Sequence, residues 1–284
     1  MTRNEFTLSK IKKDCIDEKL FEEAVKKCTV REFGANGIGT LAEKSVHAVL
    51  KYYYVPDESR HEIKVLREEE IAGLIKEGKD NKKKKARDFV ADACMDGEIY
   101  EIQTKAFYKM RDKLTLFLKE HDVTIVYPVS VTKYVRYINK ETGEIEEPKK
   151  SPQKGSVYDI VPELYGIKDL LGNEHLHFII CFVESDEYRI FKGFGQRGKK
   201  TIRKNQEKAD RVPRKILGEI RINTPEELLG LLPDGLPEDF TNRDIADATG
   251  FHISYAELLT NILCSINLLQ NKGHKGRYKV YNIV

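Results

Sequence analysis

The sequence predicts a fold of mixed α/β class, in which a mixed sheet carries helices on its faces and a small helical unit with a basic hairpin follows. Three observations lead to this prediction. Helical and strand-like patterns alternate over residues 40–130 in the order α–β–(α)–β–β–α–β, which is typical of a sheet covered by helices. The dipeptide Asp96-Gly97 joins two of the strands as a tight turn. The composition then shifts near residue 234, after a segment rich in proline and glycine.

Size and composition exclude several classes of protein. The chain has 284 residues, of which 40% are hydrophobic and 33% charged, so we expect about two domains of a soluble globular protein. The longest apolar run, residues 178–183, is far shorter than the roughly 20 residues of a membrane helix, and no signal-like segment follows Met1. The five cysteines form no C-x-x-C pair, which favours a reducing compartment over a zinc or disulfide framework. We therefore expect a cytoplasmic protein with no membrane partner.

The first elements are predicted to be mainly helical. Residues 8–30 show a mixed-charge helical pattern with a short apolar stripe. Residues 40–54 form a stronger helix, because Thr40 and Glu43 make the S/T-x-x-E capping pattern at its start. A short strand, a short helix and a polar loop are expected to follow, over residues 61–66, 68–76 and 79–85.

The next segment is predicted to be a β-hairpin. Residues 89–94 and 98–104 are strand-like, and Asp96-Gly97 between them is among the strongest hairpin turn signals. With the turn there, Asp92 faces Glu101 across the hairpin. Directly opposed residues have Cβ atoms only about 4.5–5.5 Å apart, and like charges repel at that distance. Two carboxylates so placed need a cation, a shared proton or exposure to water.

A divalent metal is the common solution when such a pair faces a cleft. Mg²⁺ accepts one or two carboxylates and keeps waters for substrate phosphates, so Asp92 and Glu101 are candidate ligands for Mg²⁺, with Mn²⁺ expected to substitute. Gln103 and Lys105 follow Glu101 at i+2 and i+4, and in a strand they share its face. They could orient a water or stabilise charge on a phosphate. The alternative interpretation is a solvated hairpin face without a metal.

Alternating helices and strands are expected beyond the hairpin. In order, these are a helix over 106–120, a strand over 123–127, a hairpin over 134–147, a basic loop over 149–155, a helix over 159–171, and strands over 176–183 and 187–192.

The stretch from Ala91 to Lys105 resembles the active site of the PD-(D/E)XK nuclease superfamily. The motif of that superfamily is an aspartate at the end of one strand, followed by Glu-x-Lys on the hairpin partner, and its α–β–β–β–α–β core has the order expected here. The resemblance implies a restriction-endonuclease-like core and metal-dependent hydrolysis of phosphodiester bonds. It also implies that Asp92 and Glu101 are metal ligands, joined by a main-chain carbonyl near Ile102.

The chain departs from that motif at one position. Where the superfamily usually has its lysine, this sequence has Gln103. Some active members carry Gln or Glu there, and Lys105 is either a substitute or a surface lysine. The first helix of the superfamily often carries a glutamate near the metals, and Glu43 matches that place, although capping alone also explains it. We interpret His47 as a satisfied or exposed histidine rather than a ligand. The predicted catalytic residues are Asp92, Glu101, Gln103, Glu43 and Lys105.

Basic residues are concentrated in one part of the chain. The net charge is only +3, but residues 192–215 contain ten Lys or Arg against two acidic residues. Such a block fits a polyanion such as nucleic acid, whereas solvated surface is the alternative. The residues expected to contact nucleic acid here are Arg197, Lys199, Lys200, Arg203 and Lys204.

Residues 234–284 are predicted to form a second, small domain after a first domain over 1–233. A short helix over 241–249, a turn, and a longer helix over 254–271 precede a basic hairpin. Helix, tight turn, helix and hairpin is the pattern of a winged helix-turn-helix. The second helix carries no Lys or Arg, so phosphate contacts are expected from the hairpin, at Lys272, Lys275, Arg277 and Lys279. A protein-contact module is the alternative.

These features predict a Mg²⁺-dependent endonuclease that acts on double-stranded DNA, in restriction, defence or recombination repair. Two alternatives remain, a catalytically inactive DNA-binding regulator on the same fold and an RNA-processing nuclease. A homodimer is a further expectation, since many such enzymes dimerise to cut both strands, although the sequence shows no dimer face.

Overall fold

The chain folds around one mixed sheet, as a computed structural model that describes residues 1–29, 45–65, 89–197 and 200–284 shows. Within these residues the sheet has seven strands in the order β1-β2-β3-β4-β6-β9, with β5 paired to β4. The β1–β2, β2–β3, β4–β5 and β6–β9 pairs are antiparallel, and the β3–β4 and β4–β6 pairs are parallel. The strands are β1 (His61–Lys64), β2 (Val90–Met95), β3 (Glu98–Ile102), β4 (Val123–Asn139), β5 (Lys149–Lys150), β6 (Leu176–Phe191) and β9 (Glu207–Ile222).

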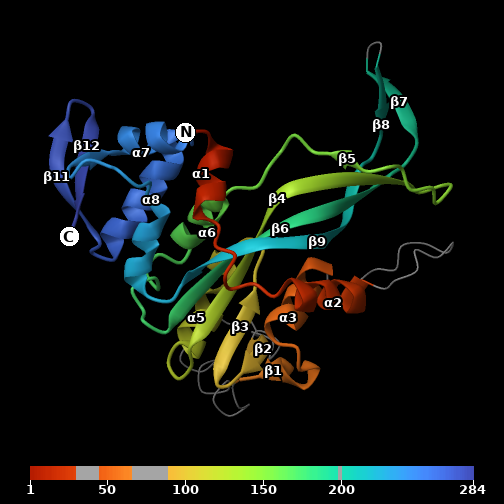
Figure 1. Ribbon diagram of the computed structural model, residues 1–284, viewed down its shortest axis with the longest axis horizontal. Helices are drawn as coiled ribbons and strands as arrows, with labels where there is room; N and C mark the ends of the chain where they lie inside the picture. Colours follow the sequence, from red (N-terminus) through yellow and green to blue (C-terminus); the bar gives the residue numbers. More distant parts are fainter. Residues whose placement is uncertain (30–44, 66–88, 198–199) are drawn as a thin grey trace, which may run out of the picture.

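Helices cover both faces of this sheet (Figure 1). On one face, α2 (Glu18–Thr29) and α3 (Ser45–Tyr54) pack on a cluster that includes Val126 of β4. On the other face, the neighbouring Ile125 belongs to a larger cluster, because successive residues of a strand point to opposite faces. The elements that cover this second face are α1 (Arg3–Lys10), η3 (Phe107–Met110), α5 (Arg111–Phe117), η4 (Val157–Ile160) and α6 (Val161–Tyr165).

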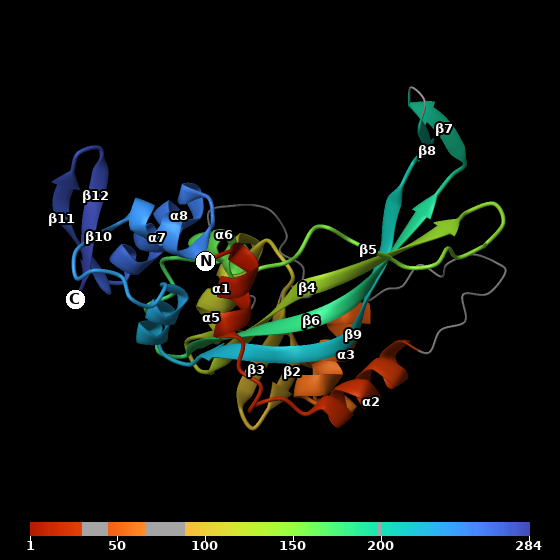
Figure 2. The ribbon, with the colours of Figure 1, turned by 45° about the horizontal axis from the view of Figure 1, so that its top comes forward.

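Strands β4, β6 and β9 extend well beyond the helical layers. A two-stranded ribbon of β7 (Phe194–Arg197) and β8 (Lys200–Arg203) links β6 to β9 and projects away from the rest of the molecule (Figure 2). We call this ribbon the β7–β8 arm. It forms a separate sheet from the central one.

The C-terminal elements form a small unit that packs against α1 and α6. It contains β10 (Phe240–Thr241), α7 (Asn242–Thr249), α8 (Ile253–Ser265), β11 (Leu269–Lys275) and β12 (Tyr278–Ile283), and η5 (Pro225–Leu231) precedes it. Its strands pair in the order β10-β12-β11. Thr241 caps α7 in a capping box with Asp244, and Gly250 ends the helix with φ +71°. The ring of Phe251 lies 4.5 Å from that of Tyr158, so this unit shares its buried cluster with the sheet.

The structure confirms the mixed α/β class and the hairpin at Asp96-Gly97, but it corrects several predicted boundaries. The single helix expected over 8–30 is two helices, α1 and α2. The helix expected over 254–271 is α8, which ends at Ser265, and β11 begins at Leu269 within the expected range. The helix expected over 159–171 is the short α6, and the basic loop over 149–155 begins with β5. The division at residue 233 stays a prediction.

One long strand replaces the two that were expected over 176–183 and 187–192. β6 runs without a break because its polar residues are buried with ion-pair partners on adjacent strands: Asp186 lies near Arg136 and Arg214. Strand β9 was not predicted, because its many charged residues hide the alternation that normally indicates a strand.

Two other predictions concern elements that lie wholly or partly outside the described residues. The helix over 68–76 and the loop over 79–85 fall there entirely, as does the start of the helix over 40–54. Among the described helices, none is long and apolar enough to cross a membrane. The five cysteines all lie in the described residues, and none of them forms a disulfide there.

Candidate active site

The β2–β3 hairpin brings the two predicted carboxylates together, but not as a ladder pair. The register follows the prediction as far as Ala93 opposite Tyr100, and Asp96 and Gly97 form the turn with φ +54° and +87°. Beyond that point the strands diverge. The Asp92 carboxylate accepts a hydrogen bond from the Ile102 amide at 2.8 Å, and the Asp92 amide donates to the Glu101 carboxylate at 3.4 Å. We call this point the β2–β3 fork.

Asp92 is held at the fork by a histidine from α3. The Nε2 atom of His47 lies 2.9 Å from Oδ2 of Asp92. Burial raises the pKa of Asp92, but the His47 hydrogen bond and charge, together with Lys113 and the Ile102 amide, outweigh burial and leave the pKa below its usual value. Asp92 is therefore an anion at neutral pH.

Glu101 is more deeply buried, with 4% of its surface exposed. Nζ of Lys113 on α5 lies 2.7 Å from its carboxylate. Burial raises the pKa of Glu101 to about 7, the negative charge of Asp92 raises it too, and Lys113 acts in the opposite direction. The carboxylate therefore titrates near neutral pH, as expected of a deeply buried acid that also has a second acid nearby.

The remaining predicted catalytic residues lie in different places. β3 ends at Ile102, so the expectation that Lys105 shares a strand face with Glu101 is wrong. The chain turns at Ala106, which has φ +62°, and Lys105 is exposed beside a pocket instead. Gln103 is half-buried and its amide donates to Val126 of β4. Glu43 lies outside the described residues.

Sequence reasoning missed Lys113 and undervalued His47. Helix α5 connects β3 to its parallel neighbour β4, so it must cross one face of the sheet, and Glu101 points to that face. A lysine on the crossover helix directly after the Glu-x-Gln strand was the available signal for Lys113. For His47 no comparable signal exists, because only the packing of α3 brings it to Asp92.

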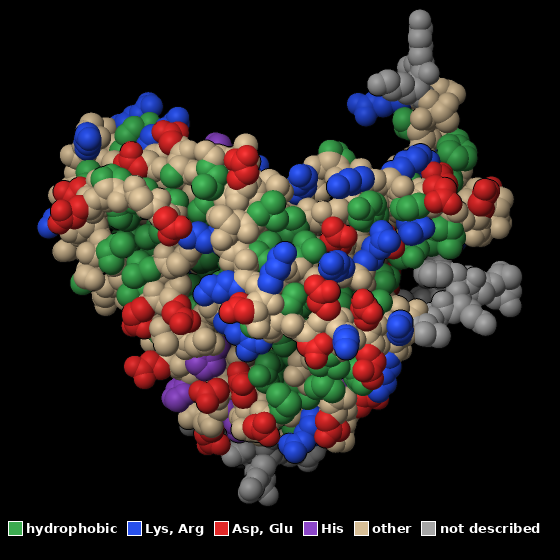
Figure 3. Space-filling view, in the orientation of Figure 1, with side chains coloured by type: hydrophobic (Ala, Val, Ile, Leu, Met, Phe, Trp, Pro, Cys, Tyr) green, Lys and Arg blue, Asp and Glu red, His purple; other side chains and the backbone are tan. Residues whose placement is uncertain are grey.

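The predicted basic residues lie far from the fork. The arm and the β11–β12 hairpin occupy opposite upper corners of the molecule in Figure 1, whereas β2 and β3 lie at its lower end. In Figure 3, Lys and Arg side chains lie on both upper parts and across the middle of this face, interspersed with acidic side chains. The four hairpin residues are exposed: Lys272, Lys275, Arg277 and Lys279.

Within the arm, the predicted contacts differ in accessibility. Arg197 and Lys204 are exposed, whereas Arg203 pairs with Glu146 and stacks over Tyr137 with its guanidinium carbon 4.2 Å from the ring centroid. Lys199 is outside the described residues, and Lys200 begins β8. Arg203 thus joins the arm to β4 and to the segment between β4 and β5.

The polar residues of α8 are also partly used inside the protein. Thr260 is fully buried and donates to Asn242, so it cannot contact bases. Asn261 is exposed and accepts a hydrogen bond from Lys168 at 3.2 Å.

Comparisons with known proteins place this chain in a family. The family described as "Domain of unknown function (DUF8091)" matches residues 70–223, which include Asp92, Glu101 and Lys113. The chain is also similar to a protein of Treponema pallidum (strain Nichols) described as "Uncharacterized protein", with 32% identity over 251 residues that cover 86% of each chain. No solved structure matches the chain.

Proposed function

The chain belongs to the DUF8091 family, and from the geometry of its own side chains we propose that it is a metal-dependent nuclease. The observation that carries this proposal is the β2–β3 fork. There the Glu101 carboxylate accepts a hydrogen bond from the main-chain amide of Asp92, His47 contacts the Asp92 carboxylate, and Lys113 contacts the Glu101 carboxylate. Burial and the charge of Asp92 raise the pKa of Glu101 to about 7, and acids with such shifted pKa values are typical of sites that act on substrates.

The order of elements around the fork supports a restriction-endonuclease-like core. Among the described residues, which leave out 66–88 between β1 and β2, the longer elements follow as the helix α3, the strands β1, β2 and β3, the helix α5 and the strand β4, which is parallel to β3. This is the core order of the PD-(D/E)XK superfamily that the motif at Asp92 and Glu101 resembles.

The donor set at the fork fits Mg²⁺ or Mn²⁺. Asp92 and Glu101 offer the hard carboxylate oxygens that these ions prefer, and a cation would offset the burial and the repulsion from Asp92 that together raise the pKa of Glu101. Among the described residues no group of three or more His, Cys, Asp or Glu forms a metal site, so waters and a main-chain carbonyl near Ile102 would complete the shell. A bound ion would supply a water of lowered pKa and neutralise charge on the phosphate.

The side chains around the two carboxylates have distinct roles in this proposal. His47 fixes the orientation of Asp92, which the Ile102 amide also holds. Lys113 holds Glu101 and provides the positive charge that the superfamily lysine would provide at Gln103. Lys113 therefore stabilises negative charge as it develops on the phosphate.

We propose double-stranded DNA as the substrate, in the cytoplasm, with restriction, defence or recombination repair as the context. The arm and the β11–β12 hairpin would contact phosphates, with residues 234–284 as a winged helix-turn-helix domain after a nuclease domain over 1–233. Because these two basic regions lie at opposite corners of the molecule, one duplex that touched both would pass along its length (Figure 1). A homodimer could place two forks on the two strands.

A plasmid nicking assay with Mg²⁺, Mn²⁺ or EDTA tests this proposal. Asp92→Asn and Glu101→Gln keep the shape of each side chain and remove a ligand charge, so each should abolish metal-dependent cleavage. Asp96→Asn is the matched control, because Asp96 is an exposed acid in the same hairpin whose role is the turn, and it should cleave normally.

The same assay separates the alternatives. Cleavage of RNA but not of DNA, lost in the same variants, would favour an RNA-processing nuclease. DNA binding without cleavage of either substrate under any metal condition would reject the enzyme and favour a regulator on a nuclease-like fold.

A further inference from the structure

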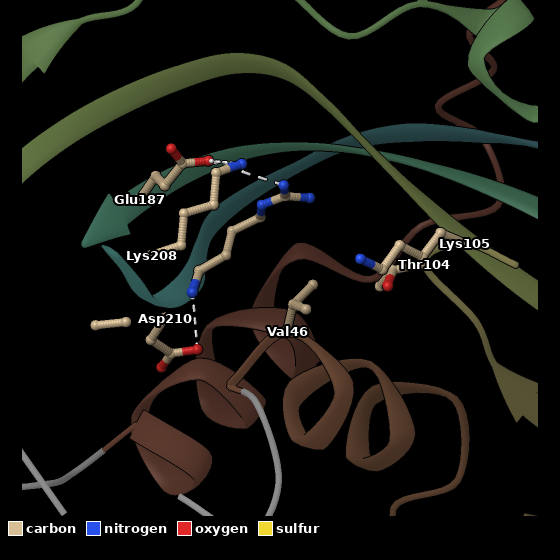
Figure 4. A pocket seen from close by; sticks show the side chains of 8 residues that line it. Val46, Thr104, Lys105, Glu187, Lys208 and Asp210 are labelled. Carbon is tan, nitrogen blue, oxygen red and sulfur yellow. Dashed lines mark hydrogen bonds and ion pairs between the residues drawn. The ribbon is translucent and has the colours of Figure 1, made fainter. Parts of the chain in front are cut away.

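A pocket of about 170 Å³ lies where α3, the end of β3 and strand β9 meet (Figure 4). Its lining residues come from four separate parts of the sequence, on or next to α3, β3, β6 and β9: Val46, Thr104, Lys105, Glu187, Lys208, Ala209, Asp210 and Arg211. Two of these residues are close in sequence to residues of the β2–β3 fork: Val46 directly precedes His47, and Thr104 follows Ile102 by two positions.

The cationic side chains of the pocket are held in place by a buried carboxylate. Glu187 is only 1% exposed and pairs closely with Arg189, whose Nε lies 2.7 Å away. Its second oxygen lies 3.2 Å from Nζ of Lys208 and 3.9 Å from Arg211. Glu187 carries one negative charge, whereas Arg189, Lys208 and Arg211 carry three positive charges. Glu187 therefore does not neutralise all of the positive charge around it.

The other acid of the pocket, Asp210, forms hydrogen bonds with two main-chain amides and one hydroxyl group. Asp210 accepts hydrogen bonds from the amide and the hydroxyl of Ser45, the first residue of α3, and from the amide of Arg211. An acidic group at a helix N-terminus is balanced by the helix dipole. Asp210 therefore does little to offset the cations across the pocket.

Two further lysines add to the excess of positive charge. Lys105 lies on the opposite wall from Lys208, and its ammonium group points into the pocket (Figure 4). Lys133 adjoins the same group of charges: burial lowers its pKa, and Arg211 and Lys208 lower it further, although Glu187 acts in the opposite direction. A lysine whose pKa is lowered by burial and by neighbouring cations indicates a concentration of positive charge that suits an anion.

We infer that this pocket is a phosphate-binding site. Its volume is many times the roughly 10–15 Å³ that one water needs, so a group the size of a phosphate fits. Lys105 on one wall and Lys208 with Arg211 on the other would donate charge-assisted hydrogen bonds to its oxygens. That the phosphate belongs to a nucleic acid strand rests on the proposed function, whereas the anion site itself does not.

Binding of inorganic phosphate tests the site directly. In titrations of the full chain followed by calorimetry, Lys105→Gln and Lys208→Gln should each weaken phosphate binding about tenfold. Both lysines are largely exposed, so neither substitution threatens folding. Lys26→Gln, an exposed lysine of α2, is the matched control and should bind as the unaltered protein does. Equal binding in all four proteins, or no binding in any, would overturn the inference.

The source of the phosphate is decided with DNA in Asp92→Asn protein, which should bind without cutting. If the site takes a strand phosphate, Lys105→Gln should reduce the slope of log affinity against log salt by about 1, and Lys26→Gln should not. An unchanged slope together with weakened phosphate binding would overturn the strand assignment and indicate a free phosphate compound. If the pocket substitutions weaken phosphate binding but the protein cleaves no nucleic acid under any metal condition, only the proposed nuclease activity is rejected. If the protein cleaves DNA but the pocket substitutions leave phosphate binding unchanged, only this phosphate site is rejected.

Discussion

At the scale of single residues, two adjacent carboxylates have opposite acid–base behaviour because their neighbours differ. Asp92 sits between a histidine and a backbone amide, and its pKa falls. Glu101 has a single cationic partner and almost no contact with solvent, and burial raises its pKa to about 7. Groups whose pKa values are driven apart in this way can take different roles in one reaction.

The raised pKa of Glu101 predicts that stability falls as pH rises. Since the folded protein holds this proton up to about pH 7 and the unfolded chain releases it near pH 4.5, the stabilisation is complete below pH 4.5 and lost as pH rises through 7. Glu101→Gln should remove roughly 2–3 kcal/mol of that pH dependence, measured as urea unfolding at pH 5 and pH 8. Mg²⁺ should flatten the same profile in the unaltered protein, and a Glu101→Gln profile as steep as the original would contradict the assignment.

Lys113 is predicted to matter more for cleavage than Gln103. Lys113→Met leaves Glu101 without its cation, so the pKa of Glu101 should rise further and the pH at which cleavage reaches half its maximum should move upward. Loss of one preorganised charge typically costs about 10²–10³ in rate. Gln103→Ala should cost less than tenfold. The measurement is a pH–rate profile for each variant. A larger loss of cleavage rate in Gln103→Ala than in Lys113→Met would mean that Gln103, not Lys113, stabilises the charge on the phosphate.

At the scale of elements, β9 depends on a glycine where the N-terminal segment crosses it. Gly218 has φ +144°, and a Cβ atom there would lie 2.2 Å from the carbonyl oxygen of Lys12, which pairs with Glu219. A side chain would thus collide with backbone that cannot move without breaking that pairing.

Gly218→Ala should therefore destabilise the protein by about 1–3 kcal/mol, as seen in the denaturant midpoint. Gly230→Ala is the matched control, because a Cβ at Gly230 meets nothing within 4 Å, and its effect should stay within about 0.5 kcal/mol. Equal stability of the two variants would mean that the main chain around Lys12 can move away from the added Cβ atom without lowering the free energy of unfolding.

At the scale of the whole molecule, the C-terminal unit and the sheet share one buried cluster. Phe251 packs on Tyr158 at 4.5 Å and on Phe6 at 6.3 Å between ring centroids, and all three are buried. The helix that starts the chain therefore joins the unit that ends it.

Phe251→Ala should cost about 3–5 kcal/mol and weaken both parts together. Circular dichroism and amide hydrogen exchange should report one common transition for the sheet and for α7–α8. Tyr108→Ala, at an aromatic residue that is 59% exposed, should change stability little. Exchange that is accelerated only in α7 and α8 would show that the unit unfolds alone.

Local sequence signals predicted those elements whose formation depends on neighbours in the chain. Asp96-Gly97 specified the hairpin because both residues accept positive φ. The short helix expected over 241–249 forms as α7, whose start is stabilised locally by the capping box between Thr241 and Asp244. The sequence failed at β6, where the buried Asp186 resembles a loop residue until its arginine partners on β4 and β9 are known. It also failed at β9, whose many charged residues obscure the alternation of a strand.

The sequence by itself therefore determined the mixed α/β class, the turn, and the presence of two acids, Asp92 and Glu101, on either side of it. Only the tertiary structure decided that the ladder opens at Asp92, that Lys113 and His47 complete the fork, and that Lys208 and Arg211 meet Lys105 across a pocket. The reason is physical: backbone preferences act over a few residues, whereas burial and charge depend on groups that only the packing of distant segments brings into contact.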